Sequence, residues 1–263
     1  MKLAVSNIAW EAGDDAHIYS LMEELGFSGL EIAPTRIFPS APYDDLPAAR
    51  RWAQELMRTH GFTVPSMQSI WFGRGERLFG SAQERAALLD YTRRAIDFAA
   101  AVGCGNLVFG CPKNRTLPGG ADSGAAAEFF RELGDYAHQR GTVLAMEANP
   151  AIYGTNYINT TAEALALVKA VNSPGFMLNL DIGTMIENGE DVDVLAGNEA
   201  YINHVHVSEP FLKPIERRAL HTRLAAFLRA ADYRGYVSIE MGRQTGGTSA
   251  LEAAMVYVRD AMG

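Results

Sequence analysis

The sequence is poor in cysteine and in positive charge, and it lacks a long apolar run. Its 263 residues contain two cysteines, Cys104 and Cys111, which are too few for a disulfide framework and lack metal-ligand spacing. Lys and Arg total 23 against 31 Asp and Glu, for a net charge of -8, which argues against general binding to a nucleic-acid backbone. No apolar run approaches the ~18 residues of a membrane span, and the N-terminal residues do not resemble a secretory signal. These absences favour a cytoplasmic globular protein without nucleic-acid or membrane partners.

What the sequence does contain is an alternation of short apolar segments and stretches with helical spacing of apolar residues. The predicted strands are Leu3–Ser6, Gly29–Ile32, Val64–Gln68, Asn106–Gly110, Val143–Glu147, Phe176–Asp181, Ile202–Val207 and Tyr236–Glu240. The predicted helices are Ile18–Leu25, Ala48–Thr59, Arg85–Val102, Ala125–Gln139, Ala162–Val171, Arg217–Ala231 and Ser249–Ala261, with another around Asp191–Leu195. Eight such βα units in ~250 residues match the size of a (β/α)8 barrel. We therefore predict a single-domain α/β TIM barrel over residues 1–263.

The alternative architecture is a doubly wound open sheet. That fold often carries a phosphate-binding loop, and the sequence contains neither G-x-G-x-x-G nor G-x-x-x-x-G-K-[ST]. No linker rich in Pro, Gly or Ser divides the chain. The barrel therefore remains the preferred prediction.

Polar residues end four consecutive predicted strands at positions that face the barrel axis. Successive side chains alternate between axis and helices, so the apolar neighbours of Glu147, Asp181 and Glu240 place these carboxylates inside. By the same alternation, His204 and His206 both face inward. Taken singly, such an acid is more often a helix cap or the partner of an arginine. Together, three carboxylates at one mouth would repel one another, and a divalent cation with oxygen and imidazole ligands removes that conflict.

Segments around these residues form a recognisable set. They are Ala145–Pro150, Leu180–Met185, His204–Pro210 and Ser238–Gly242, with looser agreement at Gly29–Ile32 and Val108–Arg115. They resemble the xylose-isomerase-like sugar phosphate isomerase/epimerase superfamily of (β/α)8 barrels. The resemblance implies a divalent metal, Mn2+ first and Mg2+, Co2+ or Zn2+ as alternatives, held by Glu147, Asp181, His206 and Glu240. His204, two residues deeper in the strand, is predicted to contact a metal ligand or the substrate; the alternative is a barrel histidine whose hydrogen bonds are satisfied within the protein.

Superfamily members that are ketose 3-epimerases imply a mechanism. Their two metal-binding glutamates, here Glu147 and Glu240, are the catalytic acid and base. One removes the proton beside the carbonyl and the other returns a proton to the opposite face, through a metal-stabilised enediolate. The implied protein is a sugar, sugar-phosphate or sugar-derivative epimerase or isomerase with a small carbohydrate substrate, and such relatives are often homodimers. Those epimerases bind the oxygens of the substrate through a histidine, an arginine and a glutamate, and this chain has Thr184, Leu212 and Tyr153 at the three positions. The resemblance therefore does not imply a free ketohexose as the substrate.

Further residues near predicted strand ends are candidate substrate contacts. They are Trp10, Gln68, Trp71, Lys113, Glu209 and Arg243. The two basic residues would bind a phosphate or carboxylate, and the tryptophans would stack on a sugar or exclude water. Gln68 and Glu31 face the axis and would bind the substrate or a neighbouring ligand. For each, a structural role in a loop is an equally simple interpretation.

Other functions remain open on the sequence alone. A lyase resembling inosose dehydratase would share the proton abstraction but expel water. A repair nuclease resembling endonuclease IV is disfavoured, because that fold-mate holds a larger zinc cluster and this chain has only six histidines. A non-catalytic ligand-binding barrel is the fourth possibility, and the presence of both glutamates argues against it.

Overall fold

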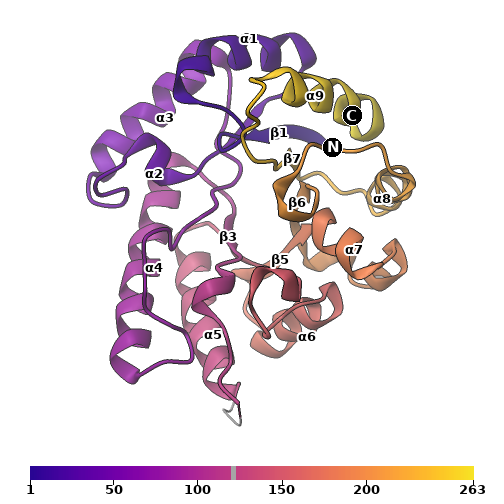
Figure 1. Cartoon of the computed structure of the whole chain (residues 1–263). Coiled ribbons are helices and arrows are strands. Elements are labelled where there is room, and N and C mark those ends of the chain that lie inside the picture. The colour runs from indigo at the N-terminus through magenta and orange to yellow at the C-terminus, as the bar shows by residue number, and fades with distance from the viewer. Residues whose placement is uncertain (120–122) are drawn as a thin grey trace.

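The structure of the protein is a computed structural model that describes residues 1–119 and 123–263. Parallel strands form a curled sheet in the order β2-β1-β7-β6-β5-β4-β3. They are β1 (Lys2–Ser6), β2 (Gly29–Glu31), β3 (Leu107–Phe109), β4 (Leu144–Glu147), β5 (Phe176–Asp181), β6 (Ile202–Val207) and β7 (Tyr236–Ile239). Helices surround this sheet, and the two chain ends lie near each other (Figure 1).

The predicted strand Val64–Gln68 is the exception, because the structure forms only isolated bridges there. Met67 pairs in parallel with Ile32, next to β2, and with Leu107 of β3. Backbone hydrogen bonds reach this segment from both edge strands. Pro65 has no N–H to donate, and proline interrupts a strand ladder. The segment therefore lies between the two edges of the sheet without becoming an eighth strand.

Most helices follow the predicted ranges closely, but two were not predicted, one after β2 and one after β5. They are α1 (Asp15–Leu25), α2 (Pro34–Ile37), α3 (Leu46–His60), α4 (Ala82–Val102), α5 (Gly124–Gln139), α6 (Thr161–Val171), α7 (Ile182–Asn188), α8 (Ala219–Ala230) and α9 (Ser249–Met262). The helix predicted around Asp191–Leu195 is present only as a short 3-10 helix, Val192–Leu195, and the α-helix of this unit, α7, comes before it. Asp181 caps α7 by accepting the backbone N–H of Thr184 at 2.8 Å. The sequence pattern does not predict this helix, because its first turn contains Gly183 and glycine is a poor helix former.

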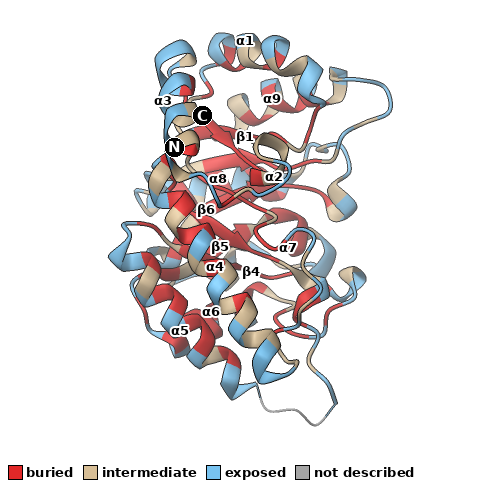
Figure 2. Ribbon diagram, turned by 90° about the vertical axis from the view of Figure 1, so that its left-hand side faces the viewer, coloured by how far each residue is buried: buried red, intermediate tan, exposed pale blue. Residues whose placement is uncertain are grey.

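Both faces of the sheet are buried (Figure 2). Apolar side chains such as Leu144 and Met146, both 0% exposed, pack under the helices as in parallel sheets generally. The axis is polar instead, as the hydrogen bond between Glu31 of β2 and His206 of β6, 2.9 Å long, demonstrates across the barrel. Within the described ranges, no helix has the length and apolar character needed to cross a bilayer.

Candidate metal centre and active site

The four residues predicted as metal ligands come together at the carboxyl ends of β4 to β7. Glu147 and Asp181 are the last residues of β4 and β5, His206 lies near the end of β6, and Glu240 directly follows β7. One ligand atom from each lies within 4.8 Å of the others. His206 Nδ1 lies 3.0 Å from Glu147 Oε1 and 3.3 Å from Glu240 Oε2. We call Glu147, Asp181, His206 and Glu240 the ligand cluster.

Asp181 is held rigidly, because both of its oxygens accept hydrogen bonds. Its Oδ2 accepts the backbone N–H of Thr184 (2.8 Å) and the Thr184 hydroxyl (2.9 Å), and its Oδ1 accepts the Ser208 hydroxyl. An ionised carboxylate offers about four acceptor positions. Asp181 is therefore a helix cap that still has room for one further electropositive partner.

Glu147 is fixed by two asparagines. Asn179 Nδ2 donates to its Oε1 (2.9 Å) and Asn149 Nδ2 donates to its Oε2 (3.1 Å). The guanidinium of Arg115, fully buried, donates in turn to Asn149 Oδ1 at 2.8 Å, and burial lowers the pKa of Arg115 to about 10. This chain of hydrogen bonds orients the Glu147 carboxylate from below the mouth.

The sequence analysis missed these orienting residues, and two of them carried a signal. Asn179 precedes Asp181 by two residues, so strand alternation also points it to the axis. Asn149 follows Glu147 by the same interval, but just beyond the strand. Arg115 lies in a loop, where no periodicity gives the direction of a side chain.

The cluster has unbalanced charge in the absence of a cation. Burial raises the pKa of Glu240 to about 7. Burial and the nearby charge of Glu147 raise the pKa of Asp181 to about 6. Burial acts to lower the pKa of His206, but the charges of Glu31 and Glu240 outweigh it and raise that pKa well above its usual 6.5. Burial and mutual repulsion therefore favour the protonated forms of Asp181 and Glu240.

The donor set fits a divalent cation. Three carboxylates and one imidazole, with no thiol among them, suit Mn2+, Mg2+, Co2+ or Zn2+. A second group formed by Glu31, His204 and His206 also brings ligand atoms within 4.8 Å of one another. Because His206 belongs to both groups, the two are not independent sites.

Two adjoining hollows lie at the ligand cluster. Glu147, Glu240 and Leu212 lie in the walls of both. The smaller, about 140 Å³, also touches Asp181 and Tyr153. The larger, about 760 Å³, extends between loops whose lining is mainly apolar. The hollows therefore give small molecules a route to both glutamates.

Several predicted substrate contacts lie at these hollows. Gln68, Trp71 and Lys113 line the larger one, and Glu209 lines the smaller. The indole N–H of Trp71 donates to a threonine of α4 at 2.8 Å, so the ring is fixed as a wall. Glu209 is buried and accepts two hydrogen bonds from Arg218, at 2.7 and 2.6 Å. Its interpretation as an exposed loop acid is therefore wrong.

Two other predicted contacts have structural partners instead. Trp10 is buried, and its indole N–H donates to Asp15 at 2.7 Å. Arg243 is exposed and forms an ion pair with Glu11. Neither is among the described residues that line the two hollows. Both lie on loops after strands, where sequence position alone does not fix whether a side chain reaches the mouth.

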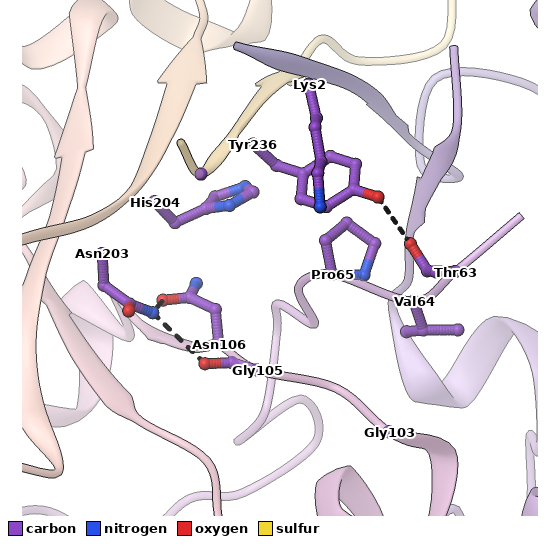
Figure 3. Close-up of a pocket in the computed structure, with 11 residues that line it drawn as sticks. Lys2, Thr63, Val64, Pro65, Gly103, Gly105, Asn106, Asn203, His204 and Tyr236 are labelled. Carbon is purple, nitrogen blue, oxygen red and sulfur yellow. Dashed lines mark hydrogen bonds between the residues drawn. The ribbon is translucent and has the colours of Figure 1, made fainter. Parts of the chain in front are cut away.

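His204 lies deeper along the barrel axis than His206, on the side away from the mouth, with the two ring centres 5.3 Å apart. It lines a separate hollow of about 300 Å³ with Lys2, Asn203 and Tyr236, residues at the amino ends of β1, β6 and β7 (Figure 3). Its Nε2 lies 3.1 Å from Glu31 Oε2. His204 thus lies beside His206, a predicted metal ligand, and beside Glu31. The hollow that it lines shares no described residue with the two hollows at the mouth.

The chain matches the family described as xylose isomerase-like TIM barrel over residues 19–260. It belongs to that family. An L-ribulose 3-epimerase from Methylomonas sp. (strain DH-1) is 34% identical over 119 residues, which cover 42% of this chain and 39% of that protein. The match thus spans well under half of that relative.

Solved structures of the same fold cover nearly the whole chain. D-psicose 3-epimerase from Clostridium cellulolyticum H10 superposes with a TM-score of 0.78 at 17% identity, covering 100% of this chain and 99% of that one. The 3-keto-D-glucoside 4-epimerase from E. coli also has a TM-score of 0.78, at 21% identity, and 99% of each chain is covered. At these identities the likeness establishes the fold, and the family membership confirms the resemblance read from the sequence.

Proposed function

We propose that this protein is a divalent-metal-dependent epimerase or isomerase of a hydroxy-carbonyl sugar or sugar derivative. The observation that carries the proposal is the convergence of Glu147 and Glu240 on His206 Nδ1, at 3.0 and 3.3 Å, beneath both hollows. The names of the relatives, a ribulose, a psicose and a ketoglucoside epimerase, support the reaction class. Mn2+ as the metal, a homodimer and a cytoplasmic location stay predictions.

Glu147, Asp181, His206 and Glu240 would hold the cation, which when bound would polarise a carbonyl and offset the negative charge that develops there. One of the two glutamates would take the proton beside the carbonyl, and the other would return a proton to the opposite face. The raised pKa of Glu240, about 7 through burial, suits a group that both accepts and donates at neutral pH. The fixed walls would exclude water from the carbanionic carbon.

The substrate would be larger than, or differently decorated from, a free ketohexose. Thr184, at one clamp position, is not free for a sugar, because two acceptors share its one hydroxyl hydrogen: Asp181 Oδ2 at 2.9 Å and the backbone oxygen of Ala148 at 2.8 Å. Tyr153 and Leu212, at the others, give the smaller hollow a phenol and an apolar wall. The larger hollow of about 760 Å³ is in the range of drug-sized ligands. Lys113 in its wall would bind an anionic substituent.

The test is incubation of the Mn2+-loaded protein in D2O with ketoses, ketose phosphates and 3-keto-glucosides, followed by mass spectrometry. An epimerase gives a stereoisomer that gains one deuterium in D2O and keeps its mass in light water. A product lighter by one water would replace this proposal with a lyase. Absence of both products and of deuterium exchange across the panel, with metal bound, would contradict an enzymatic role on these sugars.

A further inference from the structure

Glu31 is a fully buried carboxylate on the barrel axis, on the far side of the His206 ring from the ligand cluster. Its Oε2 lies 2.9 Å from His206 Nε2, and its Oε1 accepts a hydrogen bond from Gln68 at 3.2 Å. Among the described residues, the ion pairs of Glu31 are with histidines and with no lysine or arginine. A buried charge is costly unless it is balanced. The position of Glu31 therefore needs an explanation.

The two ring nitrogens of His206 face different partners. Nδ1 faces the ligand cluster, and Nε2 faces Glu31. Asn179 Nδ2 also lies 3.2 Å from Nδ1, and its amide is oriented by Asn106, which donates to Asn179 Oδ1 at 3.3 Å. A carboxylate such as Glu31 accepts, whereas the Asn179 amide donates. Glu147 and Glu240 also face Nδ1, so a cation in the ligand cluster would take the place of any hydrogen there. Glu31 would then accept the one remaining ring hydrogen, on Nε2.

We propose that Glu31 is a positioning residue for the metal ligand His206. By accepting the Nε2 hydrogen, Glu31 fixes the ring so that the Nδ1 lone pair points at the ligand cluster. Its negative charge also makes Nδ1 more basic, and therefore a stronger ligand for a metal ion. Carboxylates that bind the far nitrogen of a ligating histidine act in this way, and their loss costs about 10- to 100-fold in metal affinity. The inference rests on the proposed function for the presence of a cation.

A different arrangement of the same atoms makes a contrasting prediction. His204 Nε2 is buried 3.1 Å from Glu31 Oε2 but is not aligned for a hydrogen bond. Glu31, His204 and His206 could therefore enclose a cation of their own. One Nε2 atom cannot donate hydrogen to Glu31 and bind a cation at once, so the number of ions per chain separates the two arrangements.

The experiment titrates MnCl2 into the metal-free full-length protein by isothermal calorimetry. The wild type should bind one Mn2+ per chain. Glu31→Gln keeps the size of the side chain but removes its charge. It should raise the dissociation constant for Mn2+ by about 10- to 100-fold. His204→Asn is the matched control, because it removes the other histidine beside the same carboxylate and should leave the dissociation constant near that of the wild type.

A second measurement needs no substitution at Glu31. Nitrogen-15 NMR of histidine-labelled wild type loaded with Zn2+ reports which ring nitrogen of His206 carries hydrogen. We expect hydrogen on Nε2 and metal on Nδ1. Circular dichroism and the melting temperature of the metal-free variants establish that they are folded, and the NMR result decides the question if Glu31→Gln is not.

Each other outcome overturns the inference in a recognisable way. An unchanged dissociation constant in folded Glu31→Gln, or hydrogen on Nδ1, overturns the role of Glu31 and leaves the proposed function standing. Two Mn2+ per chain, with one lost in both variants, makes the group a second cation site instead. A wild type that binds no Mn2+ overturns both this inference and the metal dependence of the proposed function.

Discussion

The two ends of the barrel differ in how their polar groups are balanced. At the carboxyl end, three acids converge on His206, and burial keeps the pKa of Glu240 near 7. At the amino end, the hollow in Figure 3 is lined by Lys2, by His204 and by hydroxyl and amide groups that pair with one another, such as the hydroxyl of Tyr236 with that of Thr63 at 2.8 Å.

This difference indicates where a ligand is needed. Paired hydroxyls and amides have their hydrogen bonds satisfied within the protein, whereas clustered carboxylates repel one another until a cation or protons neutralise part of their charge. In TIM barrels generally, chemistry lies at the carboxyl ends of the strands and the other end contributes stability. The predictions below test whether that division holds in this chain.

The largest expected effect is loss of turnover at the carboxyl end. Glu147→Gln and Glu240→Gln should each lower kcat by about 100- to 10,000-fold, because each removes a group that transfers a proton. The measurement is deuterium incorporation into the substrate identified by mass spectrometry. Glu132→Gln, an exposed substitution on α5, is the control and should keep full activity. Near-normal rates in both mouth variants would contradict the two-carboxylate mechanism.

Regular strands made the carboxyl end predictable from the sequence. The pairing of β5 with β6 shifts register between Leu178 and Asn179, but the last residues of β4 to β7 are regular. Alternation there fixes which side chains face the axis, and it explains why Glu147, Asp181 and Glu240 meet. Asp181 also shows a limit, because it is both a helix cap and a member of the ligand cluster. The structure shows the helix cap and also brings Asp181 close to the other three predicted ligands, so its role as a cap does not exclude the predicted role as a metal ligand.

Loops and interruptions account for what the sequence did not predict. Pro65 removes a donor from the expected third strand, so that segment forms bridges alone. Trp10 and Arg115 follow strands through loops. Their directions depend on single contacts, of Trp10 with Asp15 five residues later and of Arg115 with Asn149, which is distant in the chain. Such pairs leave no periodic signal in the sequence.

A second expected effect is a loss of stability of the metal-free protein as pH rises from about 5 to 7.5. Burial raises the pKa of Glu240 from its ordinary 4.5 to about 7, so the folded protein keeps a proton that the unfolded chain releases. Folding is therefore penalised progressively above pH 4.5, and fully above pH 7. The raised pKa of His206 acts in the same direction above 6.5. At about 1.4 kcal/mol per pH unit, Glu240 contributes roughly 3 kcal/mol.

Urea unfolding in EDTA at both pH values measures this effect. Glu240→Gln should show a smaller decrease than the wild type, because its amide does not titrate. Added Mn2+ should stabilise the wild type at pH 7.5 by about 2.7 kcal/mol at 100 times its dissociation constant. A wild type whose stability falls no more than that of the variant would contradict the assignment of the proton to Glu240.

The smallest expected effect lies at the amino end. Tyr236→Phe removes a hydroxyl that lies 2.8 Å from Thr63 Oγ1 and 3.4 Å from Ser28 Oγ, and the loss of such a hydrogen bond costs about 1 kcal/mol. Urea unfolding should detect that loss, while kcat/KM and the dissociation constant for Mn2+ stay at wild-type values. A tenfold fall in kcat/KM with an intact fold would mean that the two ends are coupled along the axis, through His204 and Glu31 (3.1 Å apart), and the division between a chemical end and a structural end would no longer hold.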